Sequence, residues 1–174
     1  RLKMHLVTFR SAKGTLPGVA LEDGRVVDVS AAGFPDMLAL IANWGEAKTK
    51  VEAIVAAPPE GAVHAPGEAA LAAPVPRPPK LICVGLNWHD HARETNLPIP
   101  EVPTIFSKFA TAVIGPGEKI VLPRSSTKPD YEAELAFVIG KGGRYIPAFR
   151  WREHVFGYMN FNDVSARDYQ LATT

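Results

Sequence analysis

Residues 58–79 contain seven prolines, and this concentration limits the folds that are open to the chain. Proline lacks a backbone N–H and fixes its φ angle, so the segment cannot form a helix or a central strand. Proline-rich chain is extended and semi-rigid, as in linkers between folded units. The sequence therefore predicts a small domain at residues 1–57 and a second domain at 80–174, joined by a linker at 58–79.

The residues before the linker indicate a small α+β domain. Met4–Phe9 alternates in polarity like a strand, and Gly18–Val29 holds two short apolar runs around Asp23-Gly24. That dipeptide is typical of a type I′ hairpin turn. From Pro35 to Ala57 the apolar residues recur at helical spacing, and Gly45 is expected to separate two short helices.

The residues after the linker favour strands, so the predicted fold class is α+β and mainly β. Asn87 is a plausible N-cap for a short helix that ends at Thr95, with Asp90 three residues later as a weak capping-box partner. Apolar runs bounded by glycine and proline predict further strands. These are Lys80–Gly85, Thr104–Lys108, Lys119–Leu122 and Glu132–Ile139.

Composition excludes several classes of function. A chain of 174 residues with 47% hydrophobic content can build a core. A net charge of +1, without a run of Lys or Arg, gives no support for binding nucleic acid or an anionic membrane. No apolar run is long enough to span a bilayer, so we expect a cytoplasmic protein with small-molecule or protein partners. The single cysteine, Cys83, is predicted to be buried and inert.

Two glutamates lie two residues apart on the last predicted strand. A period of two places Glu132 and Glu134 on one face of that strand. Two neighbouring buried anions repel each other and are costly to desolvate, and a cation between them removes both problems. Asp163 follows as a further acid. The pattern suggests a hard divalent metal held by oxygen ligands, which would make the protein an enzyme.

The same residues allow simpler interpretations. A half-exposed strand could turn its other face to the core and leave the glutamates in water. Ala136 and Val138 continue the glutamate face as apolar residues, which argues against that alternative. Asp163 could instead form an Asx turn or a helix cap, and Arg167 with Asp168 could form a weak surface pair. The other face of the strand carries Ala133, Leu135, Phe137 and Ile139.

A second cluster contains His91 and Glu94, which are three residues apart and would share one face of a helical turn. A carboxylate beside an imidazole raises its basicity and fixes its tautomer, so the two residues are candidates for a general-base dyad. An exposed helix with ordinary contacts is the simpler alternative. Zinc binding by His89 and His91 is disfavoured, because no cysteine or further histidine nearby completes a tetrahedral set.

Taken in their order along the chain, these motifs resemble the fumarylacetoacetate hydrolase family. The resemblance runs from about Lys80 to the end and implies a mixed β-sandwich roll. Residues 1–57 and the linker resemble, more loosely, the small N-terminal domain of many bacterial members. The motifs that carry the resemblance are Leu81–Trp88 with His91 and Glu94, Ile114–Gly117, Asp130–Leu135 and Asn162–Asp168.

The resemblance implies roles for the two clusters. Glu132, Glu134 and Asp163 match the family's ligands for one Mg²⁺ or Mn²⁺, for which Ca²⁺ can substitute in crystals. His91 and Glu94 match a dyad on a lid, which becomes ordered over bound substrate and activates water.

The resemblance also implies a substrate class. Arg167 and Gln170 match positions that contact the substrate's carboxylate or carbonyl oxygens. The implied activity is hydrolysis of a carbon–carbon bond in a small acylpyruvate or β-diketo acid, through a metal-bound enolate. The family also contains 2-oxo acid decarboxylases, isomerases and sugar-acid dehydratases. A catalytically silent binding domain is the alternative from another class.

Family members are commonly homodimers, so we expect a dimer through the second domain.

Family members continue beyond the position of Gln170, through further strands and a catalytic lysine. The resemblance therefore implies that a product ending at Thr174 lacks the C-terminal part of the roll. Such a product would have an open sheet, and we expect it to be inactive and prone to aggregation.

Overall fold

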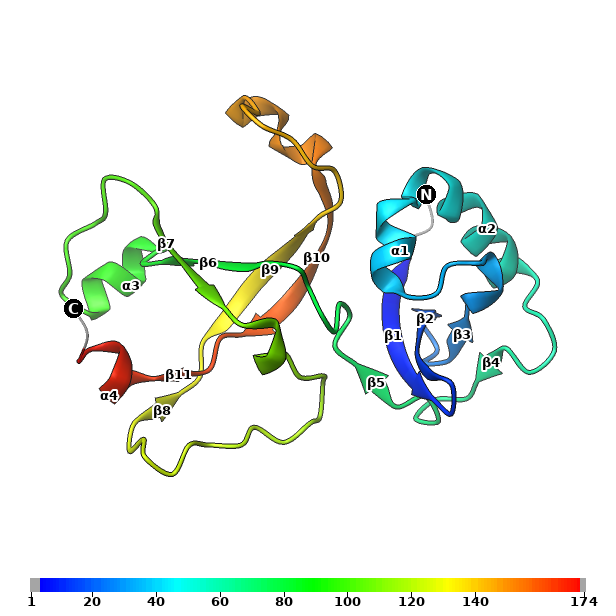
Figure 1. Cartoon of the computed structure of the whole chain (residues 1–174), viewed down its shortest axis with the longest axis horizontal. Helices are drawn as coiled ribbons and strands as arrows, with labels where there is room; N and C mark the ends of the chain where they lie inside the picture. The colour runs from blue at the N-terminus through cyan, green and yellow to red at the C-terminus, as the bar shows by residue number, and fades with distance from the viewer. Residues whose placement is uncertain (1–3, 173–174) are drawn as a thin grey trace. The chain divides into compact units, whose positions relative to one another are not determined.

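A computed structural model describes residues 4–172, which form two compact units (Figure 1). The first unit holds the residues up to Leu40 together with Glu46–Pro116. The second unit holds Ile41–Gly45 and the residues from Gly117 onward. The proline-rich segment lies within the first unit. The predicted limits of the two domains, at residues 57 and 80, stay a prediction.

The first unit is built around a five-stranded antiparallel sheet with the strand order β4-β3-β2-β1-β5. Both edge strands come from the proline-rich segment, although neither strand itself contains a proline. This segment therefore completes the sheet at both edges. The strands are β1 (His5–Ser11), β2 (Gly14–Ala20), β3 (Val26–Asp28), β4 (Val63–His64) and β5 (Leu71–Ala72).

The predicted hairpin is present between β2 and β3, but the predicted turn type is wrong. A type I′ turn needs a positive φ at both central residues. Here Gly24 has a φ of 85°, and Asp23 is not among the residues with positive φ. The Asp23 carboxylate accepts hydrogen bonds from the backbone N–H and the Nε of Arg25, at 3.1 and 2.7 Å. These bonds favour a longer loop, closed by the Leu21 N–H on the Arg25 carbonyl at 2.8 Å.

Two helices follow the hairpin, as predicted, although they are separated at Asn43 rather than at Gly45. Gly45 lies in the first turn of α2, where its cost of about 1 kcal/mol relative to alanine is tolerated because the helix packs through other residues. The helical elements of this region are η1 (Ser30–Ala32), α1 (Met37–Ala42) and α2 (Trp44–Ala56). The largest fully buried side chains are Phe9, Pro17, Val27, Val29, Leu40 and Val51.

Leu40→Ala tests the core of the first unit. Leu40 is 0% exposed, and truncating a buried leucine costs about 2–5 kcal/mol in free energy of unfolding through lost burial and a residual cavity. Leu38, on the same helix, is 37% exposed and provides the matched control. Urea unfolding should show a clear loss for Leu40→Ala and a much smaller one for Leu38→Ala. Equal losses would contradict this view of the core.

The rest of the first unit contains the antiparallel pair of β6 (Leu81–Gly85) and β7 (Thr104–Lys108), with η2 (Ala110–Ala112) after it. Both strands were predicted, and Cys83 is buried in β6 as expected.

Between these strands lies α3 (His89–Glu94), and the predicted cap at Asn87 is wrong by one residue. The capping residue is Trp88, because its carbonyl accepts the first intrahelical hydrogen bond, from the Ala92 N–H at 3.1 Å. No side chain caps this end of the helix.

The second unit contains two antiparallel strand pairs, β9 with β10 and β8 with β11 (Figure 1). The strand predicted at Lys119–Leu122 is wrong, because no strand within residues 4–172 pairs with that segment. No helix in the same range has the length and apolarity needed to cross a bilayer. The elements are β8 (Pro129–Asp130), β9 (Ala133–Ile139), η3 (Ala148–Glu153), β10 (Val155–Asn162), β11 (Ser165–Ala166) and α4 (Arg167–Gln170).

Candidate metal centre

The two faces of β9 differ in exposure, and the glutamates occupy the more buried one. Glu132, directly before the strand, and Glu134 within it are half-buried. On the other face, Leu135 is 64% and Phe137 is 58% exposed. The alternative in which the glutamates face water and the apolar residues face a core is therefore wrong for this structure.

Strand pairing brings Asp163 beside Glu132. The β9–β10 ladder ends where Asn162 pairs with Ala133. One residue further on, the Asp163 N–H donates to the Glu132 carbonyl at 3.0 Å. The Glu132 N–H in turn donates to the Asn162 side-chain oxygen at 3.0 Å. These two bonds hold the neighbouring backbones in a fixed register, so the acids meet although they are far apart in sequence.

The three predicted ligands form one cluster. Glu132, Glu134 and Asp163 each offer a carboxylate oxygen, and these oxygens lie within 4.8 Å of one another. Asp163 is only 2% exposed. The helix α4 begins at Arg167 with Ala166 as its cap, so the helix-cap interpretation of Asp163 is wrong. Three close carboxylates repel one another, and an all-oxygen set suits a hard divalent cation such as Mg²⁺ or Mn²⁺.

Arg167 contacts this cluster from α4. Its Nη1 lies 2.6 Å from Oε1 of Glu132, and its Nε and Nη2 each lie 2.9 Å from Oδ2 of Asp130. Burial alone would lower the pKa of Arg167, but the hydrogen bonds and charges of the two carboxylates outweigh it and raise the pKa above its ordinary value. Because Asp130 is also an anion, Arg167 leaves the cluster negatively charged overall, which favours a bound cation.

Sequence reasoning did not single out Asp130 as a site residue. The available signal is its position two residues before Glu132, which continues the period of two that relates the glutamates. Its partner is 37 residues away, and no sequence pattern reports that contact.

Gln170 also reaches Arg167, since its Oε1 accepts a hydrogen bond from Nη1 at 2.9 Å. The predicted contacts of Arg167 and Gln170 with substrate stay predictions. The two residues lie together on α4, one helical turn apart, so a single ligand could meet both.

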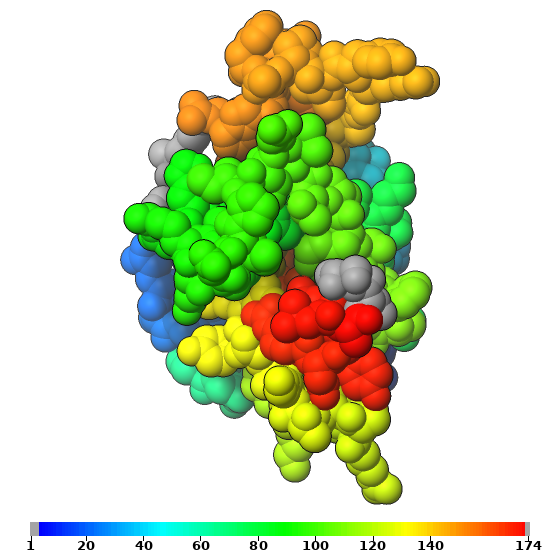
Figure 2. All heavy atoms as spheres, turned by 90° about the vertical axis from the view of Figure 1, so that its left-hand side faces the viewer, coloured from blue at the N-terminus to red at the C-terminus, as the bar shows by residue number. Residues whose placement is uncertain are grey.

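Asp168 does not form the surface pair with Arg167 that the sequence allowed. Its carboxylate accepts hydrogen bonds from the Ser126 hydroxyl at 2.7 Å and from the Thr127 N–H at 2.8 Å. These bonds attach α4 to the segment that leads into β8. Figure 2 shows the same arrangement, with α4 in red lying against the yellow segment that contains β8.

Asp168→Asn tests this attachment. The bonds from Thr127 and Ser126 hold the pKa of Asp168 below its ordinary value, so its ionised form stabilises the folded state. That stabilisation is present above the unfolded-state pKa and is lost as the pH falls through the folded-state pKa. We expect Asp168→Asn to lower the free energy of unfolding at about pH 7, with a smaller difference from wild type below about pH 4. Urea unfolding at both pH values measures this, and an equal difference would contradict it.

His91 and Glu94 lie three residues apart on α3, as predicted, with His91 half-buried and Glu94 exposed. Within residues 4–172 the structure shows no hydrogen bond or ion pair between them. The ion pair on this helix joins Arg93 and Asp90 instead. The dyad therefore stays a prediction.

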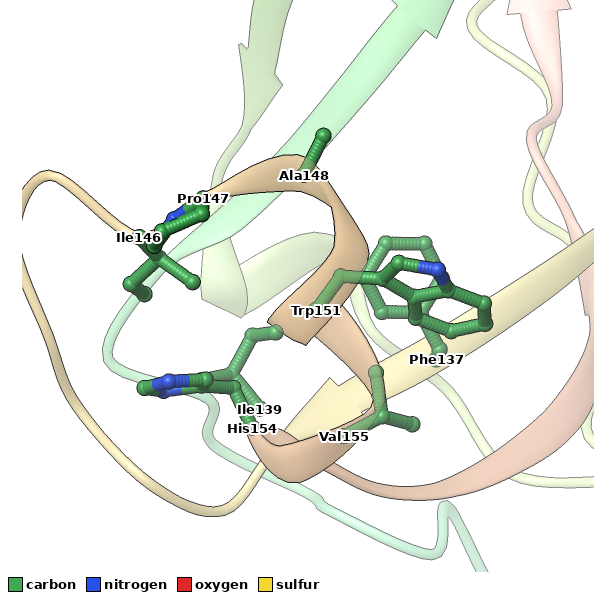
Figure 3. Close-up of a pocket in the computed structure, with 8 residues that line it drawn as sticks. All are labelled: Phe137, Ile139, Ile146, Pro147, Ala148, Trp151, His154 and Val155. Carbon is green, nitrogen blue, oxygen red and sulfur yellow. The ribbon is translucent and has the colours of Figure 1, made fainter.

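A cavity of about 480 Å³ lies on the face of β9 that carries Phe137 and Ile139 (Figure 3). Phe137 and Ile139 of β9 line it together with Ile146 and Trp151. Its lining is almost entirely apolar and includes none of the three acids. It is therefore separate from the candidate metal centre.

Comparison with known proteins places the chain in a family. Residues 80–174 match the model of the fumarylacetoacetate (FAA) hydrolase C-terminal domain. The mitochondrial oxaloacetate tautomerase FAHD2A of Bos taurus is 42% identical over 175 residues, which cover 97% of this chain and 55% of the relative. The chain thus spans about half the length of the curated relatives it matches.

Solved structures agree in fold. Fumarylacetoacetate hydrolase from Exiguobacterium antarcticum matches with a TM-score of 0.78 and 29% identity, over 98% of this chain and 59% of that one. Maleylpyruvate hydrolase from Sphingobium sp. SYK-6, in complex with manganese(II) ion and pyruvate, matches with a TM-score of 0.74 and 29% identity, over 92% and 59%. The predicted α+β, mainly β fold is confirmed. The chain belongs to the fumarylacetoacetate hydrolase family.

Proposed function

We propose that this protein is a divalent-metal-dependent enzyme that acts on a small 2-oxo acid. The observation that carries the proposal is the cluster of Glu132, Glu134 and Asp163, whose carboxylate oxygens lie within 4.8 Å of one another. Mg²⁺ and Mn²⁺ suit this donor set. When bound, such a cation supplies Lewis acidity, which stabilises negative charge developing on the oxygens of a 2-oxo acid.

The chain's own residues then bind the substrate and move a proton. The Nε and Nη2 of Arg167 face Asp130, and its Nη1 faces Glu132 and Gln170. Of the five guanidinium N–H groups, one on Nη2 remains for a substrate carboxylate. His91 acts as the general base, and Glu94 is expected to orient it once substrate is bound.

For the reaction we propose keto–enol tautomerisation of oxaloacetate. The support is the 42% identity to an oxaloacetate tautomerase across 97% of this chain. Tautomerisation removes a proton from carbon 3 and adds one to the carbonyl oxygen, so no atom is gained or lost. A general base is sufficient for the first transfer.

Hydrolysis of an acylpyruvate is the second candidate, favoured by the match to a maleylpyruvate hydrolase in complex with manganese and pyruvate. In this reaction His91 would take a proton from the water whose oxygen bonds to the acyl carbonyl carbon. The carbon–carbon bond would then break, the acyl part would leave as a carboxylate, and the pyruvate enolate would take up a proton to give pyruvate. Both candidates need the same acidic cluster.

Ultraviolet absorbance separates the two candidates. The full-length protein is incubated with Mn²⁺ and either enol oxaloacetate or maleylpyruvate, with excess chelator as the control. Acceleration of enol decay without loss of total oxaloacetate supports tautomerisation, whereas pyruvate release from maleylpyruvate supports hydrolysis. Equal rates in excess chelator would contradict the metal requirement. Failure to bind Mn²⁺ at all would favour a catalytically silent domain.

A further inference from the structure

Asp130 is the acid nearest in sequence to the candidate ligands that is not one of them. Both of its carboxylate oxygens already have partners: Oδ1 accepts the Tyr131 N–H at 3.0 Å, and Oδ2 faces the Nε and Nη2 of Arg167. Asp130 therefore occupies the Nε–Nη2 edge of the guanidinium, which is an edge through which arginine can bind a carboxylate with two N–H groups. Its contacts suit an anchor for Arg167 rather than a metal ligand.

The opposite end of the same guanidinium contacts a candidate ligand. Nη1 of Arg167 lies 2.6 Å from Oε1 of Glu132, and the second oxygen of that carboxylate can still face a cation. The guanidinium is planar and rigid, so its orientation at Asp130 sets the direction of Nη1. The position of the Glu132 carboxylate thus depends on Asp130.

The backbones that carry Asp130 and Arg167 are also held in place by hydrogen bonds. Ser165 pairs with Asp130 in the β8–β11 ladder, and the Arg167 N–H donates to the Lys128 carbonyl at 2.9 Å. The side-chain exposure falls from 45% at Asp130 to 24% at Arg167 and 19% at Glu132. Asp130, Arg167 and Glu132 therefore form a chain of contacts that becomes less exposed toward Glu132, and the backbone that carries it is fixed by hydrogen bonds.

We propose that Asp130 is a positioning residue, which holds Arg167 so that the Glu132 carboxylate is directed toward the bound cation. This inference rests on the proposed metal-dependent function. It assigns to Asp130 an effect on metal affinity although Asp130 contributes no ligand atom. Partners that orient metal ligands typically change metal affinity 10–100-fold when they are removed.

The test is a titration with Mn²⁺ alone, with free Mn²⁺ followed by electron paramagnetic resonance. We expect Asp130→Asn to weaken Mn²⁺ binding by about 10–100-fold and Asp130→Glu, which keeps the charge, to recover much of the loss. Asp23→Asn is the matched control, since Asp23 also accepts a backbone N–H and an arginine Nε but is not one of the clustered acids. It should bind Mn²⁺ as the wild type does.

A double-mutant cycle with Arg167→Lys covers the case in which Asp130→Asn fails to fold. A lysine ammonium cannot bridge two carboxylates as the guanidinium does, so Arg167→Lys should also weaken Mn²⁺ binding. Adding Asp130→Ser, which removes the carboxylate, to Arg167→Lys should change little further, because the two residues act through one connection. Additive losses, or wild-type affinity in Asp130→Asn, would overturn the inference alone. A wild type that binds no Mn²⁺ would overturn the proposed function as well.

Discussion

Asp163→Asn is expected to lower the affinity for Mn²⁺ by more than about 100-fold, since removal of positioning partners alone costs 10–100-fold. Asp163 is 2% exposed and carries one of three clustered carboxylates. Asparagine keeps the size of the side chain but removes the charge and one anionic oxygen. Because hard divalent cations depend on charged oxygen ligands, the loss should be large even where the fold is unchanged. Isothermal titration with Mn²⁺ measures it directly.

Glu153→Gln is the control for this experiment. Glu153 is a surface acid of η3, paired with Arg150 at 2.7 Å and outside the cluster. Its substitution also removes one negative charge, but it should leave Mn²⁺ affinity unchanged. If both variants lost affinity equally, overall charge would explain the effect. If Asp163→Asn bound Mn²⁺ like the wild type, Asp163 would not be a ligand.

His91→Ala is expected to reduce the catalytic rate by about 10²–10⁴-fold, the usual contribution of a general base, and to leave Mn²⁺ affinity intact. His91 is half-buried on α3 and lies outside the acidic cluster. Alanine is a good helix former, so α3 should persist. Rates with oxaloacetate and maleylpyruvate, measured alongside Mn²⁺ titration, separate loss of the base from loss of the metal.

His89→Ala serves as the matched control because His89 is exposed and lies two residues earlier on the same short helix. A rate close to that of the wild type in His89→Ala, with a large loss in His91→Ala, supports a specific role for His91. Equal losses would indicate that the helix itself had been disturbed. An unchanged rate in His91→Ala would remove it from the mechanism.

The sequence predictions succeeded where a structural feature follows from residues that are close together in the chain. The period of two at Glu132 and Glu134 follows from strand geometry, and the structure shows both on the more buried face. The β2–β3 hairpin was also predicted, because apolar runs and glycine are local signals. Its loop length was not, since a side-chain bond between Asp23 and Arg25 accompanies the longer turn.

Errors arose where hydrogen-bond partners had to be known. Lys119–Leu122 has a strand-like composition, but a strand exists only if another strand pairs with it, and none within residues 4–172 does. The cap of α3 was shifted by one residue for a similar reason. Which carbonyl begins the helix is set by the backbone path, and that path made Trp88 the cap rather than Asn87.

By itself, the sequence determined the chemistry available to this protein: two glutamates on one strand face, a later aspartate, and motifs in an order that identified the family. Only the tertiary structure decided which acids meet and what holds them. The β9–β10 ladder places Asp163 beside Glu132, and Arg167 joins Glu132 to Asp130. Residue spacing reports which neighbours share a face, whereas contacts between distant residues depend on strand pairing, which spacing does not encode.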